Sequence, residues 1–263
     1  MTIRLTDRDV QMLVKCGICR WLTTDQLKRM YFGDASPNAV QKRLRKLADA
    51  GYLRSHREHP TAEYIHAVGP KGKPLVEERG VEVAVTSDVP SQIEHLLGVN
   101  ELRLAVEQGP VAVAYCFAYW QLADLGWTYP VIPDLAFAVR AARRQAFVAE
   151  YDRGTETMDK LLEKLQRYGR GLNGFPLAAV LLVTEGNRRF DPLIRAMRCG
   201  EVVVAAPVLV AAMGEIREAG AFGTVYVALP EGGRRKLLEG CTDKPGDEPL
   251  LPGSPVEGSE DGE

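Results

Sequence analysis

The chain has 263 residues, of which 46% are hydrophobic, enough to bury a core in one large domain or, as we expect, in two smaller ones. Its net charge of −2 is unevenly spread: residues 1–80 contain 15 Lys and Arg against 9 Asp and Glu, a net +6, which leaves −8 for the remainder. The sequence has no apolar run of about 18 residues and no signal-peptide core, which excludes a membrane span or export and predicts a cytoplasmic protein.

Three helices and a hairpin are predicted over about the first 90 residues. A polar cap at Thr6 opens a helix over about 7–16 that Gly17 ends, and a second capped helix covers about 24–32. Ser36 and Pro37 begin a third helix over 37–50, since proline suits the first helical turn. Two short strands near 52–55 and 64–68 follow. This order predicts a winged helix-turn-helix.

Polar and basic side chains gather on the third helix and the hairpin. Hydrogen-bond donors of this kind suit phosphates and base edges in a major groove. A solvated basic face is the alternative for any single charged helix, but it explains neither the short connections nor the hairpin. The predicted DNA-binding residues are Asn38, Gln41, Lys42, Arg43, Arg45, Lys46, Arg54 and Arg57.

Cys16 and Cys19 form a lone C-x-x-C among five scattered cysteines. A zinc site needs about four ligands, and no second pair follows. We therefore expect reduced thiols in a reducing compartment, with these two buried at a helix end.

The second half begins with a predicted helix over 91–108 and a buried strand over 111–117. Two strands joined by a polar turn come next, then a helix that opens at Thr155 and ends near Gly169, and a buried strand over 177–183. The predicted order is therefore α-β-β-β-α-β.

The two strands after residue 131 carry acidic residues. In an antiparallel pair, Asp134 at the start of the first strand and Glu150 near the end of the second lie side by side. Hard cations such as Mg²⁺ bind to carboxylates and water, and such a metal can activate water against a phosphodiester. The alternative is that both acids simply face water at strand ends.

Two stretches of the first half, LTDRDVQMLVKCGICRWLTTDQLKRMYFG and SPNAVQKRLRKLADAGYLRS, resemble the N-terminal domain of the replication-relaxation family. PDLAFAV and FVAEYDRGTETMDKLLEKLQRY resemble its C-terminal signature, so the resemblance covers about residues 5–185. It implies a DNA-binding protein of a plasmid or mobile element, concerned with replication, copy control or mobilisation.

The order of elements is also similar to the PD-(D/E)xK nuclease core. That resemblance makes Asp134 and Glu150 the metal-binding and catalytic acids, with Glu101 as a candidate additional acid. Asp152 stands where the family has its catalytic lysine, a residue that orients water or stabilises negative charge. Lys164, with Tyr168 one turn later, is a candidate replacement cation, and Asp152 itself a candidate metal ligand. The alternative is a nuclease fold retained as a scaffold.

Beyond residue 187 the sequence predicts a helix over 189–198, a strand over 202–204, a helix over 208–218 and an edge strand over 225–227. The Gly-, Pro- and acid-rich end is expected to be disordered. The predicted domains are therefore a winged helix at 1–88, a PD-(D/E)xK-like α/β domain at 89–230 and an acidic tail at 231–263. The fold class is α+β or α/β.

Two functions follow. The first is a regulator in which the winged helix binds double-stranded DNA, while a degenerate nuclease-like domain dimerises or contacts a replication or transfer protein. The second is an active endonuclease. No cofactor is expected for the first, and Mg²⁺ or Mn²⁺ for the second. A homodimer is expected, with the leucine-bearing helix 91–108 as the candidate interface, and no membrane partner.

Overall fold

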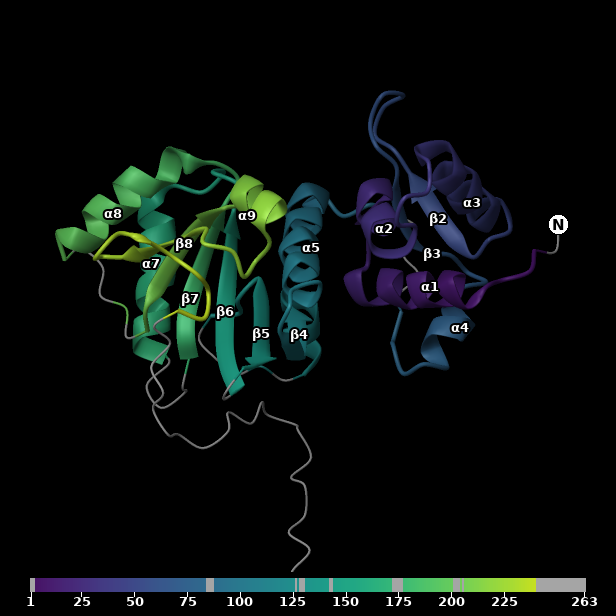
Figure 1. Ribbon diagram of the computed structural model, residues 1–263. Coiled ribbons are helices and arrows are strands. Elements are labelled where there is room, and N and C mark those ends of the chain that lie inside the picture. The colour runs from purple at the N-terminus through teal and green to yellow at the C-terminus, as the bar shows by residue number, and fades with distance from the viewer. Residues whose placement is uncertain are drawn as a thin grey trace, which may run out of the picture. The chain divides into compact units, whose positions relative to one another are not determined.

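The computed structural model describes residues 3–83, 88–125, 127, 131–141, 144–171, 177–200, 204 and 206–239 (Figure 1). The chain divides into two compact units, Met1–Glu101 and Leu102–Glu263, and we describe each by itself. The division falls inside helix α5 (Ile93–Glu107), later than the predicted boundary at residue 88. The reason is that Asn100 of α5 belongs to the first unit, where its side-chain amide donates to the carbonyls of Cys19 and Trp21 at 2.9 and 2.8 Å.

The first unit combines helices with a small antiparallel sheet of strand order β1-β3-β2. Hydroxyl side chains of Thr6, Thr23 and Ser36 cap the first three helices by accepting backbone N–H groups, as the capping pattern of the sequence predicts. The elements are α1 (Asp7–Cys19), β1 (Leu22–Thr23), α2 (Thr24–Tyr31), α3 (Pro37–Asp49), β2 (Leu53–His56), β3 (Ile65–Val68) and α4 (Lys73–Glu77).

Helix α1 is longer than predicted, because Gly17 lies inside it and does not end it. A Cβ atom at position 17 would lie 2.7 Å from a methyl group of Val76, so glycine is needed there for close packing against α4. Cys16 and Cys19 are consequently on the last turns of the helix, where both are buried. Burial, reinforced by the neighbouring Cys19, raises the pKa of the Cys16 thiol.

The second unit is built on a seven-stranded mixed sheet of order β10-β9-β8-β7-β6-β5-β4. Strands β6, β7 and β8 are parallel, and the other neighbours pair antiparallel. Mixed α and β structure agrees with the predicted class. The elements after α5 are β4 (Ala112–Ala118), α6 (Tyr119–Asp124), β5 (Leu135–Arg140), β6 (Arg144–Asp152), α7 (Met158–Gly171), β7 (Leu177–Thr184), the 3₁₀ helix η1 (Asn187–Arg189), α8 (Phe190–Arg198), β8 (Val208–Ala212), α9 (Met213–Ala219), β9 (Tyr226–Leu229) and β10 (Arg234–Arg235).

Several predicted elements are wrong in the last third of the chain. Residues 208–212 form a buried parallel strand beside β7, and only 213–219 are helical, so the predicted helix 208–218 is half strand. The predicted edge strand near Val225 is covered by β10, which pairs Arg234 with Val227. Residues 231–239, assigned to the tail, therefore continue the fold, and Leu237 is fully buried. The predicted strand 202–204, except Val204, and the tail from residue 240 lie outside the described residues.

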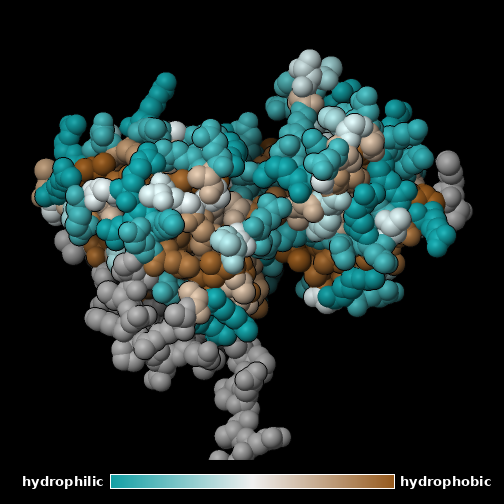
Figure 2. Space-filling view, viewed as in Figure 1, coloured by the Kyte–Doolittle hydropathy of each residue, from teal (hydrophilic) through white to brown (hydrophobic). Residues whose placement is uncertain are grey.

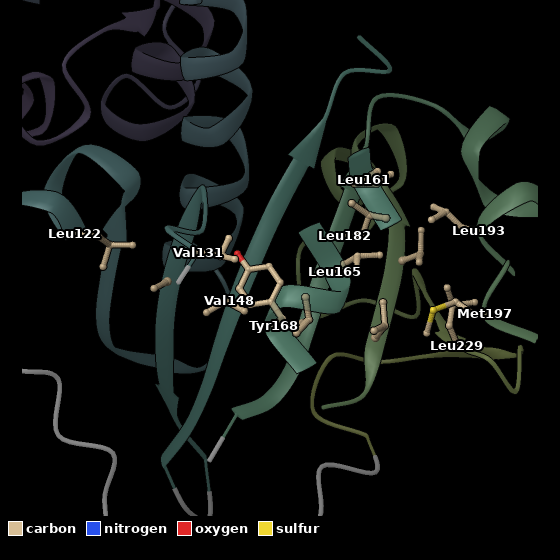
Figure 3. Packing of buried hydrophobic residues seen from close by; sticks show 14 residues of the cluster. Leu122, Val131, Val148, Leu161, Leu165, Tyr168, Leu182, Leu193, Met197 and Leu229 are labelled. Atoms are coloured by element: carbon tan, nitrogen blue, oxygen red, sulfur yellow. The ribbon is translucent and has the colours of Figure 1, made fainter. Parts of the chain in front are cut away.

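Helices α7 and α8 supply one side of a hydrophobic core against the sheet (Figure 3). Leu161 and Leu165 of α7 lie three and seven residues after its first residue, the spacing of a single helix face, and both are buried. Alternate residues of the parallel strands, among them Val148 and Leu182, face these helices. This packing places the part of α7 that carries Lys164 and Tyr168 over strand β6, where both side chains contact Glu150.

The surface seen in Figure 2 is mainly hydrophilic, with small hydrophobic patches between the charged side chains. In the described part of the chain, no helix is both long and apolar enough to cross a bilayer. The leucines of α5 proposed as a dimer interface are largely used within the chain itself, since Leu96, Leu102 and Leu104 are at most 2% exposed.

Candidate functional site

A groove of about 1100 Å³ lies on the first unit between α3, the β2–β3 hairpin and the start of α2. Six of the eight predicted DNA-binding residues line it. They are Asn38, Gln41, Lys42 and Arg45 of α3 with Arg54 and Arg57 of the hairpin. Residues up to 19 positions apart in sequence thus come together on one surface.

Helix α3 presents these side chains because its other face is buried. Val40, Leu44 and Leu47, at helical spacing, are at most 1% exposed. The polar side chains between them are consequently turned to solvent, and Arg45 is 84% exposed, with one long contact of 3.9 Å to Asp49. An exposed ion pair of this length contributes little to stability, so the Arg45 charge is available to a ligand.

The hairpin side of the groove is ordered by an aromatic contact. The guanidinium of Arg57 lies 4.9 Å from the ring centre of Tyr64 and donates to the carbonyl of Pro60 at 2.9 Å. A cation stacked on an aromatic face loses part of its rotational freedom before any ligand binds. Arg57 is therefore held at the groove in advance.

His66 lies at the base of the groove and is 3% exposed. Its ring nitrogens contact the hydroxyl groups of Thr24 at 3.0 Å and Ser55 at 2.8 Å. Burial lowers the pKa of His66 to about 4. The imidazole is therefore neutral near pH 7, and the positive charge of the groove comes from lysine and arginine alone.

Arg43 and Lys46, also predicted to contact DNA, do not line the groove. Arg43 instead donates to both carboxylate oxygens of Asp9, at 3.0 Å from its Nε, and to the carbonyl of Arg4 at 3.0 Å. Asp9 is fully buried at the start of α1. Arg43 thus joins α3 to α1, a contact between residues 34 positions apart that the sequence pattern did not reveal.

The second candidate site is an acidic cluster in the second unit, where β5 and β6 run side by side. Leu135 pairs with Ala149, so the next residues outward, Asp134 and Glu150, lie opposite each other as the sequence predicts. Asp134 accepts a hydrogen bond from the Tyr151 backbone N–H at 2.8 Å. Glu150 is only 2% exposed.

Helix α7 brings two further side chains to Glu150. Lys164 forms an ion pair with one carboxylate oxygen, and the Tyr168 hydroxyl donates to the other. Burial and the nearby charge of Asp134 raise the pKa of Glu150 well above its ordinary range, against the opposing effects of Lys164 and Tyr168. Burial alone would lower the pKa of Lys164, but the charges of Glu150 and Asp134 raise it.

Asp152 has a different environment from Glu150, although both are on β6. One oxygen accepts from the Gly154 backbone N–H at 2.7 Å, and the other pairs with Arg189 of η1 at 3.1 Å. The sequence contains no motif that links Arg189 to Asp152, because their contact depends on how η1 follows β7. Asp152 is therefore used to hold the turn after β6.

The candidate additional acid, Glu101, is held in the first unit. It accepts two hydrogen bonds from Arg29 at 2.8 and 2.7 Å and one from Gln26 at 3.0 Å. Within the described ranges, no group of three or more His, Cys, Asp and Glu side chains converges in the manner of a metal site. The local chemistry of the cluster is thus two carboxylates, one ammonium and one phenol.

The fold and these surfaces define a mixed α and β protein with a basic groove on one unit and a buried carboxylate cluster on the other. The family model described as replication-relaxation matches residues 17–173, more than half of the chain. The chain therefore belongs to the replication-relaxation family, as the motifs predicted. No curated protein and no solved structure matches it.

Proposed function

We propose that the protein binds double-stranded DNA through a winged-helix surface, formed by α3 and the β2–β3 hairpin, and regulates a plasmid or mobile element. The regulated process is replication, copy number, mobilisation or transcription. The observation that carries this proposal is the groove, where Lys42, Arg45, Arg54 and Arg57 stand against a single acid, Asp49. Positive side chains of this kind neutralise phosphates, and a helix of this size fits a major groove.

The second unit has, on this proposal, a PD-(D/E)xK-like fold that acts as a scaffold for dimerisation or for a replication or transfer protein. Two features support a degenerate site. Asp152 occupies the position of the strand lysine and is held by Arg189, and one carboxyl oxygen of Glu150 is already in contact with Lys164. A metal ion would have to displace Lys164 to reach that oxygen of Glu150.

The test is DNA binding by the full chain, measured by fluorescence anisotropy with a short duplex. Lys42→Ala combined with Arg45→Ala is expected to weaken binding roughly 10- to 100-fold near 0.1 M salt and to reduce the salt slope by about 2. Lys73→Ala, on α4, combined with Arg79→Ala, in the turn after α4, removes the same charge outside the groove and serves as the matched control. Equal binding by both double variants and the parent would overturn the proposal.

A specific observation favours the second candidate function, a metal-dependent endonuclease. Lys164 reaches Glu150 from the helix and interacts electrostatically with Asp134, which is where a cation replacing the strand lysine would be needed. A Mg²⁺ or Mn²⁺ ion, held by Asp134 and Glu150, would activate water and neutralise charge. Lys164 would then stabilise negative charge developing on the phosphate.

This candidate is tested by incubating supercoiled DNA with the protein and Mg²⁺, Mn²⁺ or EDTA. An active site predicts metal-dependent nicking that is lost in Asp134→Ala and in Lys164→Ala. Glu163→Gln, on the exposed side of the same helix, is the control and should cut normally. Binding without cutting favours the regulator, and cutting that persists in EDTA refutes the proposed metal chemistry.

A further inference from the structure

A row of arginines crosses the second unit, at a distance along the chain from both candidate sites. Arg188 is on η1, and Arg195 and Arg198 follow on α8; all three are exposed. The core-facing residues of the same helix are Leu193, Ala196 and Met197, which are at most 9% exposed. At roughly 100° of rotation per residue, Arg195 and Arg198 point away from that buried face. We name Arg188, Arg195 and Arg198 the α8 arginine row.

The charge of this row is poorly compensated. In the described part of the chain, neither Arg188 nor Arg195 has a hydrogen bond or an ion pair, although Asp191 lies four residues before Arg195. Arg167 of α7, by contrast, is an exposed cation that does have an acidic partner, since it pairs with Glu163 at 2.7 Å. The row keeps a net positive charge even when Asp191 is counted, and like charges that lie together repel each other, so an anionic ligand stabilises it.

The third member of the row is held in place. Arg198 donates to the carbonyls of Pro230 and Glu231 at 3.1 and 3.3 Å. A guanidinium fixed by backbone acceptors has lost much of its conformational freedom before binding, which lowers the entropic cost of a contact. The row is therefore partly preorganised as well as charged.

Its position relates the row to the carboxylate cluster. Arg189, the neighbour of Arg188 on η1, pairs with Asp152 at the end of β6, so the row starts close to the end of the strand that carries Glu150. From Arg188 to Arg198 the helical rise gives a length of about 15 Å. Over that length duplex DNA presents roughly nine phosphate charges, more than enough to match three arginines.

We infer that the α8 arginine row is a second DNA-contact surface, which binds the phosphate backbone of the duplex independently of base sequence. This inference rests on the proposed DNA-binding function and extends it to the second unit. The η1 end of the row adjoins Arg189, which pairs with Asp152 two residues after Glu150, so a duplex bound there lies near the carboxylate cluster. The groove on α3 supplies the sequence-dependent contacts, and the row supplies additional affinity.

The experiment measures anisotropy of a labelled duplex of mixed sequence with the full chain, over about 50 to 200 mM salt. Arg188→Gln combined with Arg195→Gln is expected to reduce the slope of log K against log salt by about 2 and to weaken binding roughly 10-fold or more. Arg188→Lys combined with Arg195→Lys should retain the slope, because phosphate contacts depend on charge. Both positions are exposed, so circular dichroism should show unchanged melting.

Arg167→Gln combined with Arg234→Gln is the matched control, since it removes two exposed but acid-paired charges from the same unit. If the slope of log K against log salt falls equally in the row variant and in this control, the effect comes from the net charge of the unit and the inference is overturned. An unchanged slope in the row variant would overturn it too. The α3 variant Lys42→Ala with Arg45→Ala separates the two proposals. If this variant loses DNA binding and the row variant does not, the proposed function stands and the inference about the α8 arginine row is wrong.

Discussion

Arg43, on the helix that carries most of the predicted DNA contacts, has its guanidinium bonded to the fully buried carboxylate of Asp9. Burial acts to raise the pKa of Asp9, but hydrogen bonds from Arg43 and Thr6 outweigh it and hold that pKa below its ordinary value. Asp9 is thus ionised in the fold and depends on Arg43 for its charge partner. The arginine fixes the position of α3 and is not free to reach a ligand.

The first prediction follows from this pair. Arg43→Ala should lower the free energy of unfolding by about 2–4 kcal/mol, because it leaves a buried carboxylate without its partner. Arg45→Ala, two residues away and exposed, should change stability by less than about 0.5 kcal/mol but weaken DNA binding. Urea denaturation followed by circular dichroism measures the first quantity. Equal stability of the two variants would show that the Asp9 contact does not hold α3.

The second prediction concerns acid sensitivity of the first unit. The pKa of His66 is lowered from 6.5 to about 4 by burial. Between these two pH values the imidazole is protonated in the unfolded chain and neutral in the folded chain. Protonation of His66 therefore does not lower the free energy of unfolding above about pH 6.5. As the pH drops from there to about 4, it lowers this free energy by on the order of 3 kcal/mol. Denaturation as a function of pH should show this loss in the parent and not in His66→Gln. His59→Gln, in the exposed turn of the hairpin, is the control and should keep the parent's pH dependence.

The third prediction concerns Glu150 and has the opposite sign. Its pKa is raised in the fold, so the folded protein keeps this proton to a higher pH than the unfolded chain does. The stability contribution of Glu150 is therefore greatest below its unfolded pKa near 4.5 and declines as the pH rises toward the folded value. Glu150→Gln, which retains an acceptor for Tyr168, should remove this decline. If Glu150→Gln and Glu163→Gln follow the same stability curve with pH, burial of the carboxyl has no energetic effect.

The fourth prediction concerns base recognition on α3. Asn38 and Gln41 are exposed in the first half of this helix. The side-chain amides of Asn and Gln form bidentate hydrogen bonds with adenine in the major groove. Sites selected from a random DNA pool should accordingly contain adenines that Asn38→Ala and Gln41→Ala no longer distinguish, at a cost of about 1–3 kcal/mol in discrimination. The salt slope should be unchanged in these variants and lower by about 1 in Lys42→Ala. If both amide variants select sites with the same adenine preference as the parent, other residues recognise those bases.

The local features of this protein were predictable from sequence because they depend on neighbouring residues. Thr6, Thr23 and Ser36 cap three helices with their own side chains, and the alternation of β5 and β6 places Asp134 opposite Glu150. Where burial was ambiguous the prediction failed. Val208 to Ala212 form a strand because they lie beside β7, while the same apolar run suits a helix when it is considered alone.

What only the tertiary structure decided is the partner of each charge. The sequence pattern of α3 does not distinguish an arginine that faces solvent from one that forms a buried ion pair. Arg43 and Arg45 differ because α1 brings Asp9 to Arg43. Likewise Arg189 meets Asp152, and Lys164 meets Glu150, through packing of η1 and α7 on the sheet. Helix capping and strand alternation depend on residues that are close in the sequence. Ion pairing and burial depend on segments far apart in the sequence, which come into contact only when the core forms.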